Sequence, residues 1–186
     1  MKHLDSVPPS AAHATALSTA IATAFTAALF LAPPTAHAAD TTQQFSANIA
    51  GKTWESDNDG LLLIFPTKGV FNINAVTKGA SAYPPPKTPV DRLHIMCTGY
   101  AGKAAKFGPA EFTSRRCYAT FQRGTKPYGK APDAEFTTDG AANSLEITAV
   151  RGKVLEGRFS FEMKDKATGE RISIKDGKFL VEDRQL

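Results

Sequence analysis

The sequence is poor in the residues that most metal and catalytic sites require. It has two cysteines, one tryptophan and four histidines in 186 residues. His3, His13 and His37 lie close to the N-terminus, so His94 is the only histidine in the rest of the chain. This excludes a zinc site built from several histidines there, and any catalytic triad would have to use His94.

Several motifs with recognised chemistry are also missing. The chain has no phosphate-binding loop, nucleophile elbow or dinucleotide-binding glycine pattern. The cysteines do not form a Cys-x-x-Cys pair, which argues against an oxidoreductase. No helix-turn-helix, zinc-finger or stacking-sheet pattern occurs, so we expect no nucleic-acid partner. We expect no cofactor and no metal, and the balance favours a protein without catalytic activity.

Residues 55–60 resemble the beginning of a calcium loop, because acidic residues alternate before a glycine. The twelfth position of such a loop requires a glutamate, and here it is Pro66. A hairpin turn accounts for the same residues. The segment therefore predicts a turn and no calcium site.

Residues 1–38 have the pattern of a secretory signal peptide. An apolar run over residues 16–31 precedes Pro33-Pro34 and the small-residue motif Ala36-His37-Ala38. The run is shorter than the roughly 20 apolar residues that span a bilayer, so we expect no stable membrane anchor. Cleavage after Ala38 would leave a single domain over residues 39–186 that acts in the periplasm or outside the cell.

Cys97 and Cys117 both fall in the part that would be exported. In an oxidising compartment, an even pair in a small domain is typical of a structural disulfide, with free thiols or a metal site as the alternative. Cys97 lies two residues from Ile95, and Cys117 lies two residues from Ala119. Residues two apart in a strand point to the same face of the sheet, so both sulfurs should face the core with these apolar neighbours. A disulfide that closes this loop of twenty residues would stabilise the fold by roughly 3 kcal/mol.

Alternation of period two recurs along the exported part, whereas helical periodicity is scarce. Strands are expected near residues 45–49, 61–65, 71–75, 92–100 and 111–121. The C-terminal part predicts a four-stranded meander over residues 145–150, 154–163, 171–175 and 178–182, in which Asp176-Gly177 is a strong hairpin signal. We expect an all-β domain of eight to ten antiparallel strands, closed as a β-barrel or a β-sandwich.

Two long loops interrupt this alternation. Residues 80–89 contain Tyr83-Pro84-Pro85-Pro86, which cannot donate backbone hydrogen bonds to a sheet, and residues 123–132 are basic. If successive strands are antiparallel neighbours, both loops emerge at one end, where they would form a binding edge. The candidate binding residues are Tyr83, Pro85, Arg123, Lys126, Tyr128 and Lys130. The alternative is that both are ordinary surface loops.

The outer face of the strands around the cysteines is unusually apolar for a surface in contact with water. Its outward residues are predicted to be Arg92, His94, Met96, Tyr100, Phe112, Arg116 and Tyr118. Either another sheet covers these residues or a partner binds them. We expect the N-terminal strands to cover them.

Both ends of the exported part carry strand-and-turn motifs. They are Phe45-x-Ala47-x-Ile49-x-Gly51-Lys52-x-Trp54, Gly157-x-Phe159-Ser160-Phe161 and Ile172-x-Ile174-x-Asp176-Gly177-x-Phe179. These motifs resemble small exported bacterial β-proteins of uncharacterised function, many of them lipoproteins. This chain lacks their lipid-attachment cysteine, since its first cysteine is Cys97. The resemblance implies an exported β-fold and assigns no catalytic residue.

From the sequence we expect a protein-binding module of the bacterial envelope, of the inhibitor, immunity or adaptor type, with another envelope or secreted protein as its partner. One alternative is an envelope hydrolase, which requires several acids to converge in one pocket. Those acids would come from Glu55, Asp57, Asp59, Asp91 and Glu111. The other alternative is a β-barrel that carries a small apolar ligand, which requires an interior cavity. The net charge of +4 is dispersed and indicates no particular partner.

Overall fold

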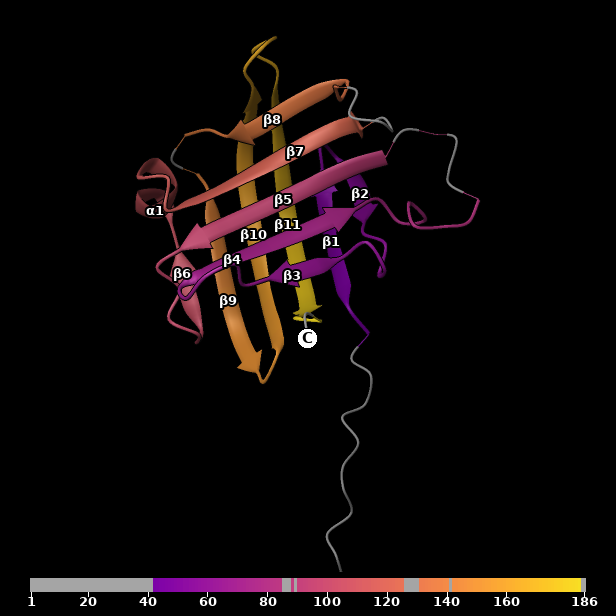
Figure 1. Cartoon of the computed structure of the whole chain (residues 1–186). Helices are drawn as coiled ribbons and strands as arrows, with labels where there is room; N and C mark the ends of the chain where they lie inside the picture. The colour runs from indigo at the N-terminus through magenta and orange to yellow at the C-terminus, as the bar shows by residue number, and fades with distance from the viewer. Residues whose placement is uncertain (1–41, 85–87, 89, 126–130, 141, 185–186) are drawn as a thin grey trace, which may run out of the picture. The chain divides into compact units, whose positions relative to one another are not determined.

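The computed structural model describes residues 42–84, 88, 90–125, 131–140 and 142–184 (Figure 1). The predicted signal peptide lies outside these residues, and so do the binding candidates Pro85, Lys126, Tyr128 and Lys130. The signal peptide and the cleavage after Ala38 therefore stay predictions.

Eleven strands and one short helix occur in the described residues. In chain order they are β1 (Gln44–Ile49), β2 (Lys52–Glu55), β3 (Leu62–Ile64), β4 (Val70–Val76), β5 (Val90–Thr98), β6 (Ala105–Phe107), α1 (Pro109–Thr113), β7 (Cys117–Thr125), β8 (Ala134–Thr138), β9 (Ser144–Arg151), β10 (Val154–Asp165) and β11 (Arg171–Glu182).

The strands form one curled antiparallel sheet, a half-barrel. Its main path runs β2-β1-β11-β10-β8-β7-β5-β4-β3, while β9 pairs with β10 and with β6. In Figure 1, β4, β5 and β7 run across the direction of β9, β10 and β11, and the inner faces of both groups contribute to one hydrophobic core. The predicted all-β antiparallel class is confirmed, with eleven strands where eight to ten were expected.

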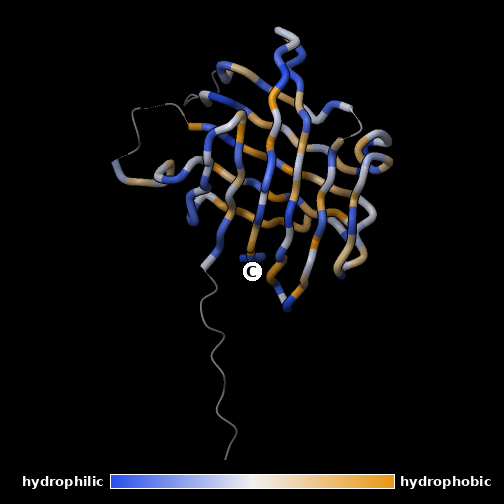
Figure 2. Tube along the Cα trace, turned by 180° about the vertical axis from the view of Figure 1, so that it is seen from behind, coloured by the Kyte–Doolittle hydropathy of each residue, from blue (hydrophilic) through white to orange (hydrophobic). Residues whose placement is uncertain are grey.

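Alternation of apolar and polar residues places this core inside the curl, and Figure 2 shows it as alternating orange and blue along the strands. Phenylalanine rings fill the interior in a connected series. The ring centroids of Phe45 and Phe159 are 5.0 Å apart, those of Phe159 and Phe161 are 5.1 Å apart, and Phe112 packs on Phe161 at 5.5 Å. Burial of each such side chain contributes about 1.5–3 kcal/mol, so the rings are a main source of stability.

Strand β10 is the place where the sheet divides. Residues 154–160 of β10 pair with β9, whereas Met163 to Asp165 pair with β8. Asn143, only 1% exposed, spans the division: its Nδ2 donates to the carbonyl oxygen of Gly140 at 2.9 Å, and its Oδ1 accepts from the Glu162 N–H at 2.9 Å. Strands β8 and β9 therefore diverge on one side of β10, around a satisfied buried amide.

The C-terminal part differs from the predicted four-stranded meander, because residues 171–182 form the single strand β11. Asp176 has a φ of 53°, and the pairing registers of β11 shift around it, which is the behaviour of a bulge. A Cβ atom on Gly177 would lie 2.5 Å from the Phe159 ring. The Asp-Gly pair thus bends a continuous strand around a core ring, and three strands, β9, β10 and β11, make the meander.

The strand predicted at residues 111–121 also begins later, at Cys117. Pro109 occupies the first turn of α1, and the Glu111 carboxylate accepts the Gly108 N–H at 2.8 Å, so the preceding residues form a helical turn. This turn directs Phe112 into the core, where it is 7% exposed, and Tyr100 is buried equally. The prediction that Phe112 and Tyr100 face outward is wrong.

Cys97 and Cys117 form the predicted disulfide. They lie opposite each other in the pairing of β5 with β7, and both are fully buried. The disulfide indicates an oxidising, extracytoplasmic environment. Among the described residues, no helix has the length and apolar character needed to cross a membrane.

Candidate functional site

The bases of the two long loops lie side by side, as expected from the strand order. Val90 pairs with Thr125, and the Gly124 N–H donates to Oδ1 of Asp91 at 2.9 Å. Of the candidate residues that the structure describes, Tyr83 is 96% exposed. Arg123 forms a bidentate pair with Glu170: its Nη1 donates to Oε1 and its Nη2 donates to Oε2, each at 3.1 Å. Arg123 is therefore already engaged within the fold, whereas Tyr83 is open to solvent.

Several of the acids that a hydrolase would need are engaged in bonds within the fold. Glu55 pairs with Lys78 at 2.8 Å, and Asp57 accepts the Ser81 N–H at 2.7 Å. Glu111 pairs with Arg116 at 2.6 Å, next to α1. These acids hold loops and helix ends in place, and none of the five lines the grooves described below.

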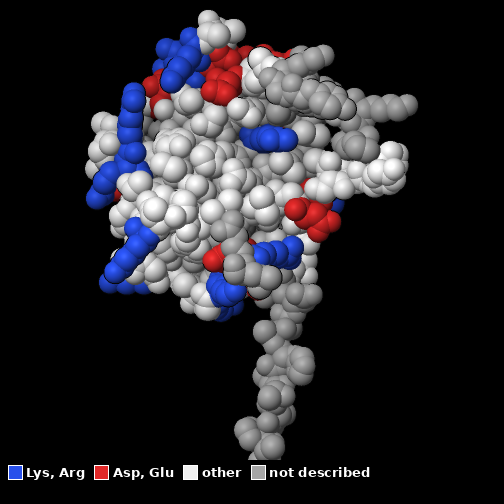
Figure 3. Space-filling view, viewed as in Figure 1, with Lys and Arg blue, Asp and Glu red and all other residues white. Residues whose placement is uncertain are grey.

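The centre of the outer surface of β3, β4, β5, β7 and β8 carries no charged side chain. The outward residues at this centre, which we call the front face, are Leu62, Ile64, Asn72, Asn74, His94, Met96, Tyr118, Thr120 and Thr137. Arg92 of β5 and Glu135 of β8 face outward in the adjacent row and mark one margin of the front face. Figure 3 shows the front face as a broad area of white atoms with charged side chains around its margin.

Strand register orders the front face into two rows. One row crosses the sheet from Leu62 through His94 and Thr120 to Thr137, and the other runs from Ile64 through Met96 to Tyr118. None of the described strands covers these rows: β1 pairs with β11 and β2 instead. The expected coverage by the N-terminal strands is therefore wrong.

At the centre of the front face, Tyr118 contacts both Met96 and His94. The Tyr118 hydroxyl donates to the Met96 sulfur at 3.5 Å, and the Tyr118 and His94 rings meet edge to face with centroids 5.7 Å apart. Burial lowers the pKa of the His94 imidazole below its ordinary value. The imidazole is therefore neutral at neutral pH, which keeps the centre uncharged.

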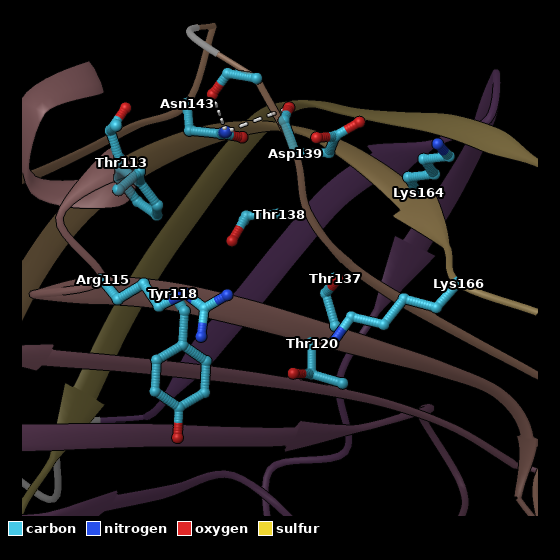
Figure 4. Close-up of a pocket in the computed structure, with 12 residues that line it drawn as sticks. Thr113, Arg115, Tyr118, Thr120, Thr137, Thr138, Asp139, Asn143, Lys164 and Lys166 are labelled. Atoms are coloured by element: carbon cyan, nitrogen blue, oxygen red, sulfur yellow. Dashed lines mark hydrogen bonds between the residues drawn. The ribbon is translucent and has the colours of Figure 1, made fainter. Parts of the chain in front are cut away.

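Two grooves cross the front face and adjoin at Tyr118 and Thr120, which line both. One groove, of about 760 Å³, extends over His94 and Asn74 towards β3. The other, of about 720 Å³, extends over β8 towards the division of the sheet and is drawn in Figure 4. Together they form a continuous depression across the strands.

The second groove is basic, and we call it the basic groove. Hydroxyl groups of Thr113, Thr120, Thr137 and Thr138 line its floor and walls, together with Arg115, Lys164 and Lys166. In Figure 4, Arg115 and Lys166 reach inward from opposite sides. Within the described ranges, none of these three cations has an ion-pair partner, and Asp139, the acid of the groove, pairs with Arg171 at 2.7 Å.

Local structure holds the backbone that carries these cations. Arg115 follows α1 with a φ of 59°, directly after Ser114, whose hydroxyl donates to the Ala110 carbonyl oxygen at 2.8 Å. Lys164 and Lys166 are exposed on either side of Asp165, which is 3% exposed. The Asp165 carboxylate accepts the N–H groups at residues 167, 168 and 135, and these hydrogen bonds lower its pKa.

The basic groove was not predicted from the sequence. Thr120 and Lys166 are far apart in the chain and come together because β8 pairs with both β7 and β10. The one signal present in the sequence is the outward position of Met96 and Tyr118, which marks the front face but not its cationic end. The chain matches no protein-family model, no curated protein and no solved structure.

Proposed function

We propose that this protein is a binding module of the bacterial envelope, periplasmic or secreted, that engages another exported protein through the front face. The observation that carries this proposal is the absence of charge from the front face, because a solvated sheet face normally presents charged side chains. The opposite outer surface of the same sheet is a direct comparison. It presents Glu146, Glu156, Arg158, Lys175 and Lys178.

The centre of the front face has the composition of a protein-binding surface. Tyrosine and methionine are enriched at the centres of such interfaces, and charged residues are depleted there. Tyr118, Met96 and His94 are already held by mutual contacts, so ordering them on binding costs little entropy. Asn74 and Thr120 place hydrogen-bonding groups on either side of His94 in its row.

Other observations favour a binding module over the two alternatives. The interior positions that a carrier would leave open hold packed rings, such as Phe71 edge to face against Tyr100 with centroids 5.1 Å apart. The acids that a hydrolase would bring together instead form separate bonds, as Glu55 does with Lys78 and Glu111 does with Arg116. The oxidising environment indicated by the disulfide is the setting in which an exported partner would be met.

Site-specific photo-crosslinking tests the proposal. A benzophenone amino acid replaces Thr120 on the front face or, as the matched control, Thr148 on the charged surface of β9. After illumination of cells that export the protein, we expect a discrete protein adduct from position 120 and none from position 148. The proposal is contradicted if neither position gives an adduct, or if both give the same set.

A further inference from the structure

We infer that the basic groove binds several consecutive carboxylates of an acidic peptide segment. This segment belongs to the partner protein and lies next to the uncharged part of the partner that contacts the front face. This inference deepens the proposed function and rests on it. It names the chemistry of the partner at one end of the same surface.

The cations of the basic groove differ from the neighbouring arginines in their ion pairs. Neighbouring arginines are neutralised: Arg171 by Asp139 at 2.7 Å, Arg116 by Glu111 at 2.6 Å. Arg115, Lys164 and Lys166 have no such partner in the part of the chain that the structure describes, yet all three line one groove. An uncompensated cluster of cations attracts an anion from outside.

The hydrogen-bond donors of the basic groove suit carboxylates. Arginine presents a planar fork that matches a carboxylate, and lysine adds point charges that accept several orientations. The hydroxyls of Thr113, Thr137 and Thr138 can donate to further oxygens along the groove. Such a spread of donors suits several carboxylates in succession better than one anion at a single point.

The basic groove is large, and it adjoins the other groove of the front face. A volume of about 720 Å³ exceeds what one inorganic anion fills, and it falls in the range of roughly 300–1,000 Å³ typical of sites for larger ligands. The basic groove opens at Tyr118 and Thr120 into the groove that crosses His94. An extended segment in the basic groove would therefore continue directly onto the front face, as expected for part of a bound protein.

The test uses acetylated hexaglutamate as the probe and the purified, disulfide-bonded protein labelled with nitrogen-15. We expect hexaglutamate to shift the amide resonances of Thr113, Arg115, Thr137 and Lys166, with an affinity that falls as salt rises, and hexalysine to shift none of them. If hexaglutamate shifts no resonance of the basic groove, the inference is overturned.

Charge-neutralising variants localise the binding. The variant Arg115→Gln, Lys164→Gln, Lys166→Gln should bind hexaglutamate about tenfold more weakly, because it removes three exposed ion pairs, each of which contributes little by itself. The matched control, which removes the same charge from lysines outside the basic groove, is Lys153→Gln, Lys175→Gln, Lys178→Gln. Equal loss of affinity in both variants would mean attraction to net charge alone and would overturn the inference.

Two other anions separate the possible sources of negative charge. Inorganic phosphate should not compete at millimolar concentration, and a hexamer of galacturonic acid should bind more weakly than hexaglutamate. Competition by phosphate would identify a small-anion site, and tighter binding of the uronic acid would identify a polysaccharide site; either result overturns the acidic peptide.

The photo-crosslinking at Thr120 separates failure of this inference from failure of the proposed function. An adduct at position 120 without hexaglutamate binding leaves the binding module standing and removes the acidic segment. Loss of both contradicts both proposals.

Discussion

The side-chain Oε1 of Gln43 accepts a hydrogen bond from the backbone N–H of Glu182 at 2.8 Å, although 139 residues separate them. The Nε2 of the same side chain donates to the Leu61 carbonyl oxygen at 3.1 Å. One buried amide thus joins the beginning of β1, the turn before β3 and the end of β11. It holds together the two ends of the sheet path that give the half-barrel its curl.

Replacement of Gln43 by alanine should lower the free energy of unfolding by about 1–3 kcal/mol, because it leaves a buried N–H and a buried carbonyl oxygen without partners. Urea denaturation measures the change. Gln44→Ala is the matched control, since Gln44 is adjacent and exposed. A loss at Gln43 no larger than the loss at Gln44 would show that the amide does not close the sheet.

The disulfide should contribute most of its stabilisation through the unfolded chain. The double variant Cys97→Ala, Cys117→Ala should lose roughly 3 kcal/mol, the value expected for a closed loop of this length. The measurement is urea denaturation with and without reductant. Reductant should destabilise the wild-type protein and leave the double variant unchanged; an effect on both would point to a different target of the reductant.

Acid should weaken the fold through Asp165. Three backbone N–H groups lower the pKa of its carboxyl in the folded protein below the ordinary value of about 3.8, so its stabilising contribution is complete above that value and is lost as the pH falls through the folded pKa. Asp165→Asn should therefore be less stable than wild type at pH 7, and the two should converge below about pH 3.8. Denaturant midpoints over pH 2.5 to 7 check this, and a constant difference across the range would contradict it.

The His94 imidazole should titrate below the ordinary histidine value of about 6.5. Burial disfavours its charged form in the folded protein, so the fold loses stability as the pH falls below that value. The side chains around it in the groove are Leu62, Asn74, Arg92, Tyr118, Thr120, Gln122 and Glu135. A nuclear magnetic resonance titration of His94, the one histidine among the described residues, gives the pKa, and a value above 6.5 would contradict the expected effect of burial.

The fold class and the disulfide could be predicted because each rests on local signals. Alternation in the chain around Cys97 and Cys117 places both sulfurs on the inner side, and the structure pairs them directly. The strand-and-turn motif that contains Gly51 is a local signal of the same kind, and Gly51 has a φ of 82° in the turn between β1 and β2.

Asp176-Gly177 shows why the number of strands in the C-terminal meander was not predictable. A type I′ hairpin and a bulge both place positive φ angles at such a pair, and the local sequence does not distinguish them. The choice depends on Phe159 of β10, whose ring occupies the space above Gly177 and requires the strand to continue past it.

The candidate site depends on contacts that are still more distant. Tyr118 and Met96 were identified on the outer side from alternation alone, but Phe112 was misplaced, because a single helical turn at Pro109 reverses its direction. The cations Lys164 and Lys166 join the front face only through the pairing of β8 with β10. No periodicity within one segment carries that information.

The most direct test of the account is the effect of one positive charge on partner capture at the centre of the front face. Thr120→Arg introduces that charge between His94 and Thr137, and Thr148→Arg introduces the same charge on the opposite surface. Each variant is exported, its melting temperature is compared with wild type, and the amount of protein crosslinked by a lysine-reactive reagent is measured. We predict that Thr120→Arg loses at least nine-tenths of the adduct while Thr148→Arg keeps it; an undiminished adduct in a folded Thr120→Arg protein would contradict binding through the front face.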